Sequence, residues 1–214
     1  MTKASLPSFL TVKRVSETEY VINKSRFIGR CFPVESEEEA TMKIAEIRKQ
    51  HWDATHNCFA YRVGKTGSVA RFSDDGEPSS TAGKPIMDVL CAKDITNVLC
   101  VVTRYFGGIL LGAGGLVRAY SRSAADAVDA AGIMKKTYAV CVDVRVDYQN
   151  YSSVEAYVRS KGKIADSNFC EHVEIKAFIP EKDIEVFEKE ITELTNGRIT
   201  LQKTDTADFI DLGL

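Results

Sequence analysis

The sequence predicts an α+β protein of two domains, and three observations carry this prediction. Segments with a helical period of apolar residues are mixed with runs of β-branched and aromatic residues that are typical of strands. The last third of the chain follows the order β-α-β-β-α-β, which is the ferredoxin-like arrangement. Residues 1–135 carry 18 Lys and Arg against 15 Asp and Glu, whereas residues 136–214 carry 10 against 15. We therefore expect domains at residues 1–134 and 138–214.

The expected N-terminal domain contains strands, helices and one loop defined by turn chemistry. Ser36 predicts the start of its first helix because a serine side chain can cap the free N–H groups there. The strands are expected at 9–15, 18–25, 26–34, 57–64, 68–74 and 97–105, the helices at 36–52, 84–94 and 114–132, and the loop at 74–83.

The expected C-terminal domain follows after residue 137. Its helices are predicted at 148–162 and 181–197, because each places apolar residues along one face. Its strands are predicted at 138–146, 164–169, 171–179 and 198–205.

The composition predicts a cytoplasmic globular protein. Hydrophobic residues make up 44% and charged residues 27% of the 214 residues, and no apolar run approaches the ~20 residues that span a bilayer. The N-terminal stretch lacks an apolar segment of signal-peptide length, so we expect no secretion. The six cysteines never form a C-x-x-C pair, which predicts reduced thiols, most of them buried, rather than a zinc site or a disulfide framework.

A glycine-rich segment, "RYFGGILLGAGGLVRAY", lies between a predicted strand and a predicted helix. Its glycines are Gly107, Gly108, Gly112, Gly114 and Gly115, with Arg104 before them and Arg118 after them. This segment does not fit the dinucleotide-binding pattern, and "TAGKP" at residues 81–85 does not fit the Walker pattern, so standard binding of NAD or ATP is not expected. Two interpretations stay open: tight packing of the loop against the sheet, and anion binding at the start of the helix.

An acidic loop, "DDGEPSSTAG", places Asp74, Asp75 and Glu77 within four residues. Three carboxylates can hold a metal ion or serve as acid and base, but Asp side chains also commonly bond to nearby backbone N–H groups in turns. A third interpretation is an ion pair from this loop to Arg104 or Arg118. His56 directly precedes a strand and is a candidate polar site residue, although a hydrogen-bonded structural histidine is the more common case.

Three motifs together give the chain a resemblance to the YigZ/IMPACT family. They are "ATHNCFAYRVG", "FSDDGEPSSTAGKPIM" and "VVTRYFGGILLGAGGLVRAYS", in this order. The resemblance implies a ribosomal-protein-like α+β N-terminal domain and, in the bacterial branch, an extra C-terminal domain. It also implies relatives in eukaryotes that regulate translation and carry an additional N-terminal domain, for which we expect no room in this chain. The family implies no nucleophile and no metal ligand.

The family pattern falls on polar, cationic and glycine positions of this sequence: His56, Asp74, Asp75, Gly76, Glu77, Gly83, Lys84, Pro85, Arg104, Tyr105, Gly107, Gly108, Gly112, Gly114, Gly115 and Arg118. The leading hypothesis is a translation-associated regulator without catalytic activity that binds RNA or the ribosome. Lys84, Arg104 and Arg118 would meet phosphate, and Tyr105 would stack on a base. The alternative is a small metal-dependent hydrolase that uses the acidic loop at residues 74–77. The sequence predicts no cofactor, no bound metal and no membrane contact, and it leaves the oligomeric state open.

Overall fold

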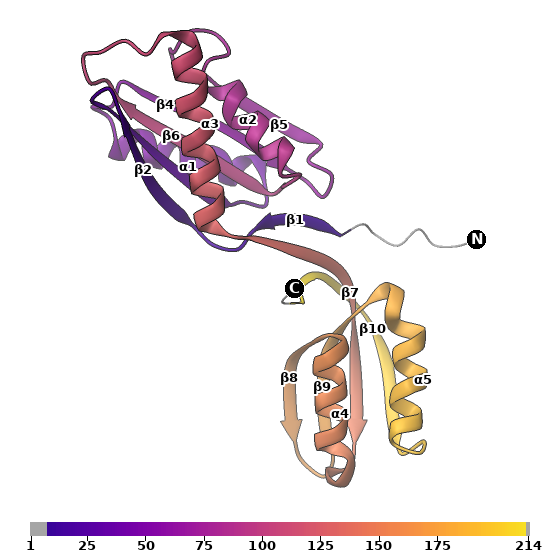
Figure 1. Cartoon of the computed structure of the whole chain (residues 1–214). Coiled ribbons are helices and arrows are strands. Elements are labelled where there is room, and N and C mark those ends of the chain that lie inside the picture. The colour runs from indigo at the N-terminus through magenta and orange to yellow at the C-terminus, as the bar shows by residue number, and fades with distance from the viewer. Residues whose placement is uncertain (1–7, 213–214) are drawn as a thin grey trace. The chain divides into compact units, whose positions relative to one another are not determined.

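The computed structural model describes residues 8–212, which form two compact units (Figure 1). The N-terminal unit is Phe9–Met134 and the C-terminal unit begins at Lys135. The α+β class predicted from the sequence is confirmed, with two sheets and five α-helices in the described chain. The N-terminal stretch in which we expect no signal peptide begins at residue 1, and the second expected domain ends at residue 214. Their outermost parts, residues 1–7 and 213–214, lie outside the described residues.

The N-terminal unit is built on a sheet with the strand order β2-β3-β6-β4-β5. All four neighbouring pairs in this sheet are antiparallel. The strands are β1 (Phe9–Val12), β2 (Ser16–Ile22), β3 (Ser25–Pro33), β4 (His56–Val63), β5 (Val69–Ser73) and β6 (Val98–Tyr105), and the helices are α1 (Glu37–Gln50), α2 (Gly83–Ala92) and α3 (Gly112–Ala131).

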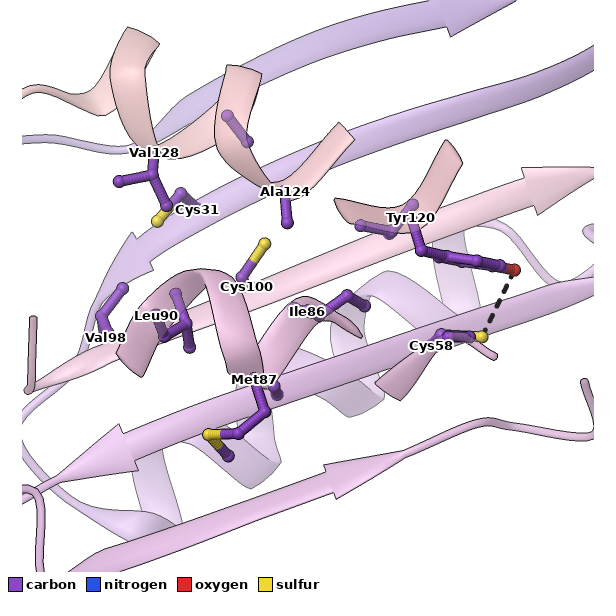
Figure 2. Close-up of a cluster of buried hydrophobic side chains, with 14 of the residues drawn as sticks. Cys31, Cys58, Ile86, Met87, Leu90, Val98, Cys100, Tyr120, Ala124 and Val128 are labelled. Atoms are coloured by element: carbon purple, nitrogen blue, oxygen red, sulfur yellow. Dashed lines mark hydrogen bonds between the residues drawn. The ribbon is translucent and has the colours of Figure 1, made fainter. Parts of the chain in front are cut away.

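Helices cover both faces of this sheet (Figure 1). Leu99 and Val101 of β6 point to the α1 side and pack with Ile44 and Ile47 of that helix. The alternate residues of β6 point to the α2 and α3 side, where Cys100 packs in the larger core (Figure 2). A strand that is buried on both faces needs apolar residues at every position, which explains the unbroken run "VLCVV".

The C-terminal unit has the β-α-β-β-α-β order that the sequence predicts. Its strands lie in the order β10-β7-β9-β8. One hydrophobic core joins the inner face of this sheet to α4 and α5. The elements are β7 (Ile133–Val146), α4 (Tyr148–Lys161), β8 (Lys163–Phe169), β9 (Val173–Pro180), α5 (Ile184–Leu194) and β10 (Ile199–Asp211).

Strand β7 is longer than the sequence predicts. Residues 135–137, which lie between the two expected domains, are strand backbone. Lys136 and Thr137 pair with Asp211 and Ile210 of β10, which itself extends six residues beyond its predicted end at 205. The extension was missed because a register shift between Lys203 and Ala207 breaks the apolar alternation of β10.

The cysteines divide into four buried and two exposed thiols. Cys91 and Cys170 are exposed, and Cys31, Cys58, Cys100 and Cys141 are buried. All six are free. Burial raises the pKa of Cys31 and of Cys58 to about 12, so little reactive thiolate forms there near neutral pH.

We expect a thiol reagent to modify only Cys91 and Cys170 rapidly in the native protein, and all six cysteines after unfolding in denaturant. Absorbance of the released chromophore from an aromatic disulfide reagent measures both values. Rapid reaction of Cys31 or Cys58 in the native protein, identified by mass spectrometry, would contradict the burial.

No helix between residues 8 and 212 combines the length and the apolar character that crossing a membrane requires.

Candidate functional site

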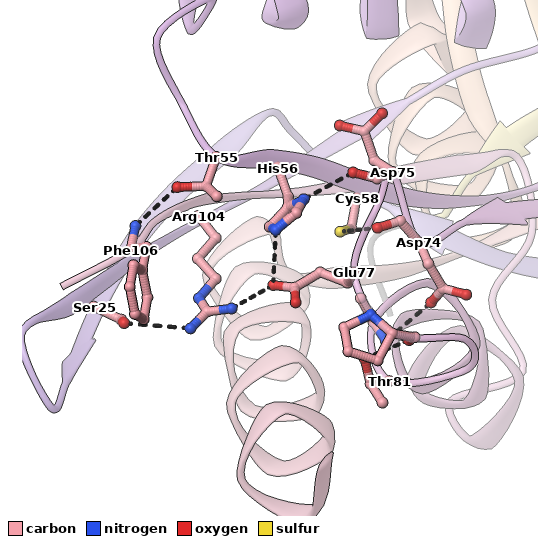
Figure 3. A network of polar contacts seen from close by, with 12 residues as sticks. Ser25, Thr55, His56, Cys58, Asp74, Asp75, Glu77, Thr81, Arg104 and Phe106 are labelled. Atoms are coloured by element: carbon pink, nitrogen blue, oxygen red, sulfur yellow. Dashed lines mark hydrogen bonds and ion pairs between the residues drawn. The ribbon is translucent and has the colours of Figure 1, made fainter. Parts of the chain in front are cut away.

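A buried ion pair joins the acidic loop to the strand that precedes the glycine-rich segment (Figure 3). Arg104 Nη1 donates to Glu77 Oε1 at 2.6 Å, and the two side chains are 6% and 3% exposed. The guanidinium also lies over the rings of Phe27 and Phe106, with its carbon atom 5.3 Å and 5.5 Å from their centroids. Two of the interpretations that the sequence left open are therefore realised: the ion pair between the acidic loop and Arg104, and hydrogen bonds from backbone N–H groups to the two Asp side chains.

Glu77 collects further contacts from α3 and β4. The hydroxyl of Tyr120 donates to Glu77 Oε1 at 2.8 Å, and burial raises the pKa of this phenol. His56 Nε2 lies 3.8 Å from the same oxygen, and His56 Nδ1 lies 2.8 Å from the carbonyl oxygen of Asp75. Because a carbonyl oxygen can only accept, His56 carries a proton on Nδ1. One carboxylate thus links the acidic loop, the sheet and α3.

Asp74 organises the start of α2. Its Oδ1 accepts from the backbone N–H groups of Ala82 and Gly83 at 3.1 Å and 2.8 Å, and its Oδ2 accepts from Ser80 at 2.9 Å. The residue at the N-cap position of α2, Ala82, has no side chain that can do this. Asp74 therefore caps α2 from a distance in sequence.

Asp75 ties the acidic loop to β4 and α1. Its Oδ2 accepts from the backbone N–H of Asn57 at 2.6 Å, and its Oδ1 pairs with Arg48 at 2.5 Å. All three acids of the loop are thus engaged by the protein itself. Within residues 8–212, no three His, Cys, Asp or Glu side chains gather closely enough to hold a metal ion. The arrangement gives the hydrolase alternative no support.

The glycine-rich segment combines packing with exposure. Gly107 is a packing residue, because a Cβ added there would lie 2.0 Å from the carbonyl carbon of Lys24 in the β2–β3 turn. Gly108 and Gly112 have φ values of +83° and +67°, and an added Cβ at either would meet nothing within 4 Å. Packing therefore explains the first glycine of the loop, and backbone conformation explains the next two.

The N-terminus of α3 is bare of side-chain caps. Leu111 at the N-cap position offers no hydrogen bond, and the first turn holds no acidic residue. Gly112 and Gly114 are exposed there and Gly115 is half-buried, which leaves backbone N–H groups uncovered. The Arg118 guanidinium lies against this turn, with Nη1 3.6 Å from the point where a Cβ of Gly114 would be. Arg118 makes no hydrogen bond or ion pair to any described residue.

The other predicted phosphate ligands lie in different settings. Lys84 is on α2 and pairs with Asp88 one turn further along that helix. Tyr105 points to the α1 side, where its hydroxyl bonds to His51 Nδ1 at 2.8 Å and to Asp53 at 3.1 Å. Arg104 is buried as described above. Of the three cations that the sequence predicts to meet one anion, Lys84 and Arg104 are thus paired with carboxylates, whereas Arg118 is paired with no described residue.

The sequence reasoning missed residues that hold this region together. Tyr120 and Cys58 were not singled out, although Tyr120 is a polar group in the Leu116–Tyr120–Ala124 stripe of α3. Cys58 Sγ lies 3.0 Å from the carbonyl oxygen of Asp74. Lys24 was missed as well: it is exposed beside Gly107 and has no side-chain partner in the described chain. The sequence offers one indication of Tyr120: it carries a hydroxyl group at a position where the helical spacing predicts a buried apolar residue.

Two family descriptions match this chain. "Impact N-terminal domain" matches residues 23–128, and "Domain of unknown function (DUF1949)" matches residues 144–198. The chain is 41% identical over 199 residues to "IMPACT family member YvyE" of Bacillus subtilis, and the match covers 92% of each protein. The chain belongs to the IMPACT family.

Other members of the IMPACT family match different shares of this chain. "IMPACT family member YigZ" of Escherichia coli is 33% identical over 84% of this chain and 90% of its own length. "Protein IMPACT" of Mus musculus is 34% identical over 94 residues, which is 42% of this chain and 29% of the mouse protein. A solved structure described as "Crystal structure of an hypothetical protein" has a TM-score of 0.60 and 31% identity, and covers 92% of this chain and 98% of its own. The sequence-based resemblance to the family is confirmed.

Proposed function

We propose that this IMPACT family protein is a translation-associated binding module that holds RNA, either free or within the ribosome, at the N-terminus of α3. The observation that carries the proposal is the Arg118 guanidinium, which lies unpaired against a helix start without a capping side chain. Free N–H groups and the positive end of a helix dipole attract a phosphate oxygen, and an arginine beside them adds a full charge.

The residues around the glycine loop, 106–111, support the same role. Lys24 provides a second free cation next to Gly107. Phe106 is 46% exposed and Leu110 is 84% exposed, so apolar surface lies beside the cations. Nucleic-acid surfaces commonly combine phosphate-binding cations with side chains that pack on bases. The buried network of Glu77, Arg104 and Tyr120 then has a structural role, because it fixes the acidic loop and α3 to the sheet.

The translation setting rests on the eukaryotic IMPACT proteins, which the resemblance marks as translational regulators. The unpaired cysteines fit a reducing compartment, and we propose a cytoplasmic location on that ground. No catalytic step is assigned, because every carboxylate of the acidic loop and His56 is used in holding the loop.

The test is binding of the full chain to a fluorescein-labelled single-stranded RNA over a range of salt concentrations. We expect a double change, Lys24→Gln with Arg118→Gln, to weaken binding and to reduce the slope of log K against log salt by about 1.4, or ~0.7 per lost phosphate contact. A matched control, Lys43→Gln with Arg122→Gln, removes the same charge from cations that already pair with Glu46 and Asp126. Equal losses in the two double variants, or no retention of the wild type on RNA or ribosomes at low salt, would refute the proposal.

A further inference from the structure

A cationic pocket lies in the C-terminal unit, at the end of the sheet where β7 ends and β9 and β10 begin. Its volume is about 320 Å³, within the range of small-ligand sites. The strand register brings its walls together, because Val146 of β7 pairs with Ile199 of β10 and with Val173 of β9. The pocket is lined by Arg145, Val146, Asp147, His172, Arg198, Ile199 and Thr200.

Two arginines of this pocket have no partner. Neither Arg145 nor Arg198 makes a side-chain hydrogen bond or ion pair within residues 8–212, and both are exposed. Glu174 is the register partner of Arg145 on β9, yet the two side chains form no ion pair. Most other arginines of the described chain do have a carboxylate or carbonyl partner, so two free guanidinium groups in one pocket are unusual here.

The acid in the pocket wall does not neutralise these cations. Asp147 caps α4: its Oδ1 accepts from the backbone N–H of Asn150 and from Asn150 Nδ2, each at 2.9 Å. The positive end of the α4 dipole compensates the charge of a carboxylate held in this way. The remaining polar groups are the imidazole of His172 and the hydroxyl of Thr200, which can both donate to an anion.

The segments that carry these groups are held in place. Arg198 follows a turn in which Asn196 and Gly197 have φ values of 49° and 77°, and its backbone N–H bonds to Thr195 O at 3.0 Å. His172 lies in the β8–β9 turn, and the hydroxyl of Tyr148 donates to Cys170 O in this turn at 2.6 Å. The pocket is therefore built on strand ends and fixed turns and not on a free loop.

We propose that this pocket is a phosphate site. Arginine presents its N–H groups as a planar fork that matches two oxygens of a phosphate, and two such forks with a hydroxyl and an imidazole make a complete set of donors. The phosphate belongs to an RNA chain or to a small phosphorylated compound. The RNA form of this inference rests on the proposed function, whereas phosphate binding itself does not.

Titration of the ¹⁵N-labelled full chain with sodium phosphate tests the site, with sodium chloride at equal ionic strength as the ionic control. We expect saturable amide shifts at residues 145–147, 172 and 198–200 that chloride does not produce. Arg145→Gln with Arg198→Gln should weaken phosphate binding at least tenfold. The matched control, Arg159→Gln with Lys189→Gln, should leave it unchanged. A further variant, Arg198→Lys, keeps the charge but loses the fork, and should bind phosphate more weakly than wild type while remaining folded.

The RNA titration described above separates the two sources. A lower salt slope for Arg145→Gln with Arg198→Gln assigns the pocket to RNA phosphate. Phosphate binding with an unchanged RNA slope assigns it to a small phosphorylated compound. Phosphate shifts that match those of chloride, or that persist in the double variant, overturn the proposal. RNA binding that is lost on changing Lys24 and Arg118, together with phosphate shifts that match those of chloride, leaves the proposed function intact while this site fails.

Discussion

Replacing Glu77 by Gln should reduce the free energy of unfolding by about 3–5 kcal/mol, because it leaves the Arg104 guanidinium buried without its counter-charge. The pair is 2.6 Å long and its two side chains are 6% and 3% exposed, so solvent screens it little. Denaturation by urea at neutral pH, followed by circular dichroism, measures the loss.

Two further variants give this prediction its controls. Glu37→Gln removes the charge from the exposed pair with Arg71, whose side chain is 66% exposed, while the amide oxygen can still accept from the Tyr61 hydroxyl, so it should cost at most about 1 kcal/mol. Combining Glu77→Gln with Arg104→Met removes both charges and should be less destabilising than the sum of the two single changes. A similar loss for Glu77→Gln and Glu37→Gln would show that the buried pair has no special weight.

Replacing Gly107 by Ala should destabilise the N-terminal unit by more than the about 1–3 kcal/mol that is typical of overpacking. An added Cβ would lie 2.0 Å from the carbonyl carbon and 2.2 Å from the carbonyl oxygen of Lys24, and backbone cannot move aside as a side-chain tip can. Urea denaturation measures this effect as well.

Gly114→Ala is the matched control for the glycine loop. Its added Cβ would lie 3.6 Å from Arg118 Nη1, an ordinary contact, and alanine favours a helix over glycine by about 1 kcal/mol. We therefore expect this change to leave stability equal or higher. Destabilisation of the same size at both positions would mean that the whole loop, and not Gly107 alone, is set by packing.

The fold was predictable because local pattern and long-range packing agree in most elements. Ser36 does cap α1, by accepting from the backbone N–H of Glu39, and Gly132 does end α3 with a positive φ of 70°. Strand β7 was predicted too short because "IMKKT" has a lysine pair and no clear alternation, while its pairing with β10 depends on residues about seventy positions away in the chain.

The site was predictable only in part. The sequence singled out the acidic loop and the glycine-rich segment as candidate site segments, and it left open whether an ion pair joins them. It did not show that Arg104 would be the buried partner and Arg118 the free one, because both are arginines at the ends of the same segment. That difference arises from the sheet: Arg104 lies on β6 between Phe27 and His56, its register partners on β3 and β4, whereas Arg118 is on the exposed side of α3.

The contacts of the three carboxylates in the acidic loop bear on how enzymes are inferred from sequence motifs. Asp74 caps α2, Asp75 contacts β4 and α1, and Glu77 pairs with the buried Arg104. Each carboxylate therefore has a separate structural role. Selection for the shape of such a loop would keep its acids as strictly as selection for turnover would. The presence of three carboxylates in one short loop is therefore not by itself evidence of a hydrolase.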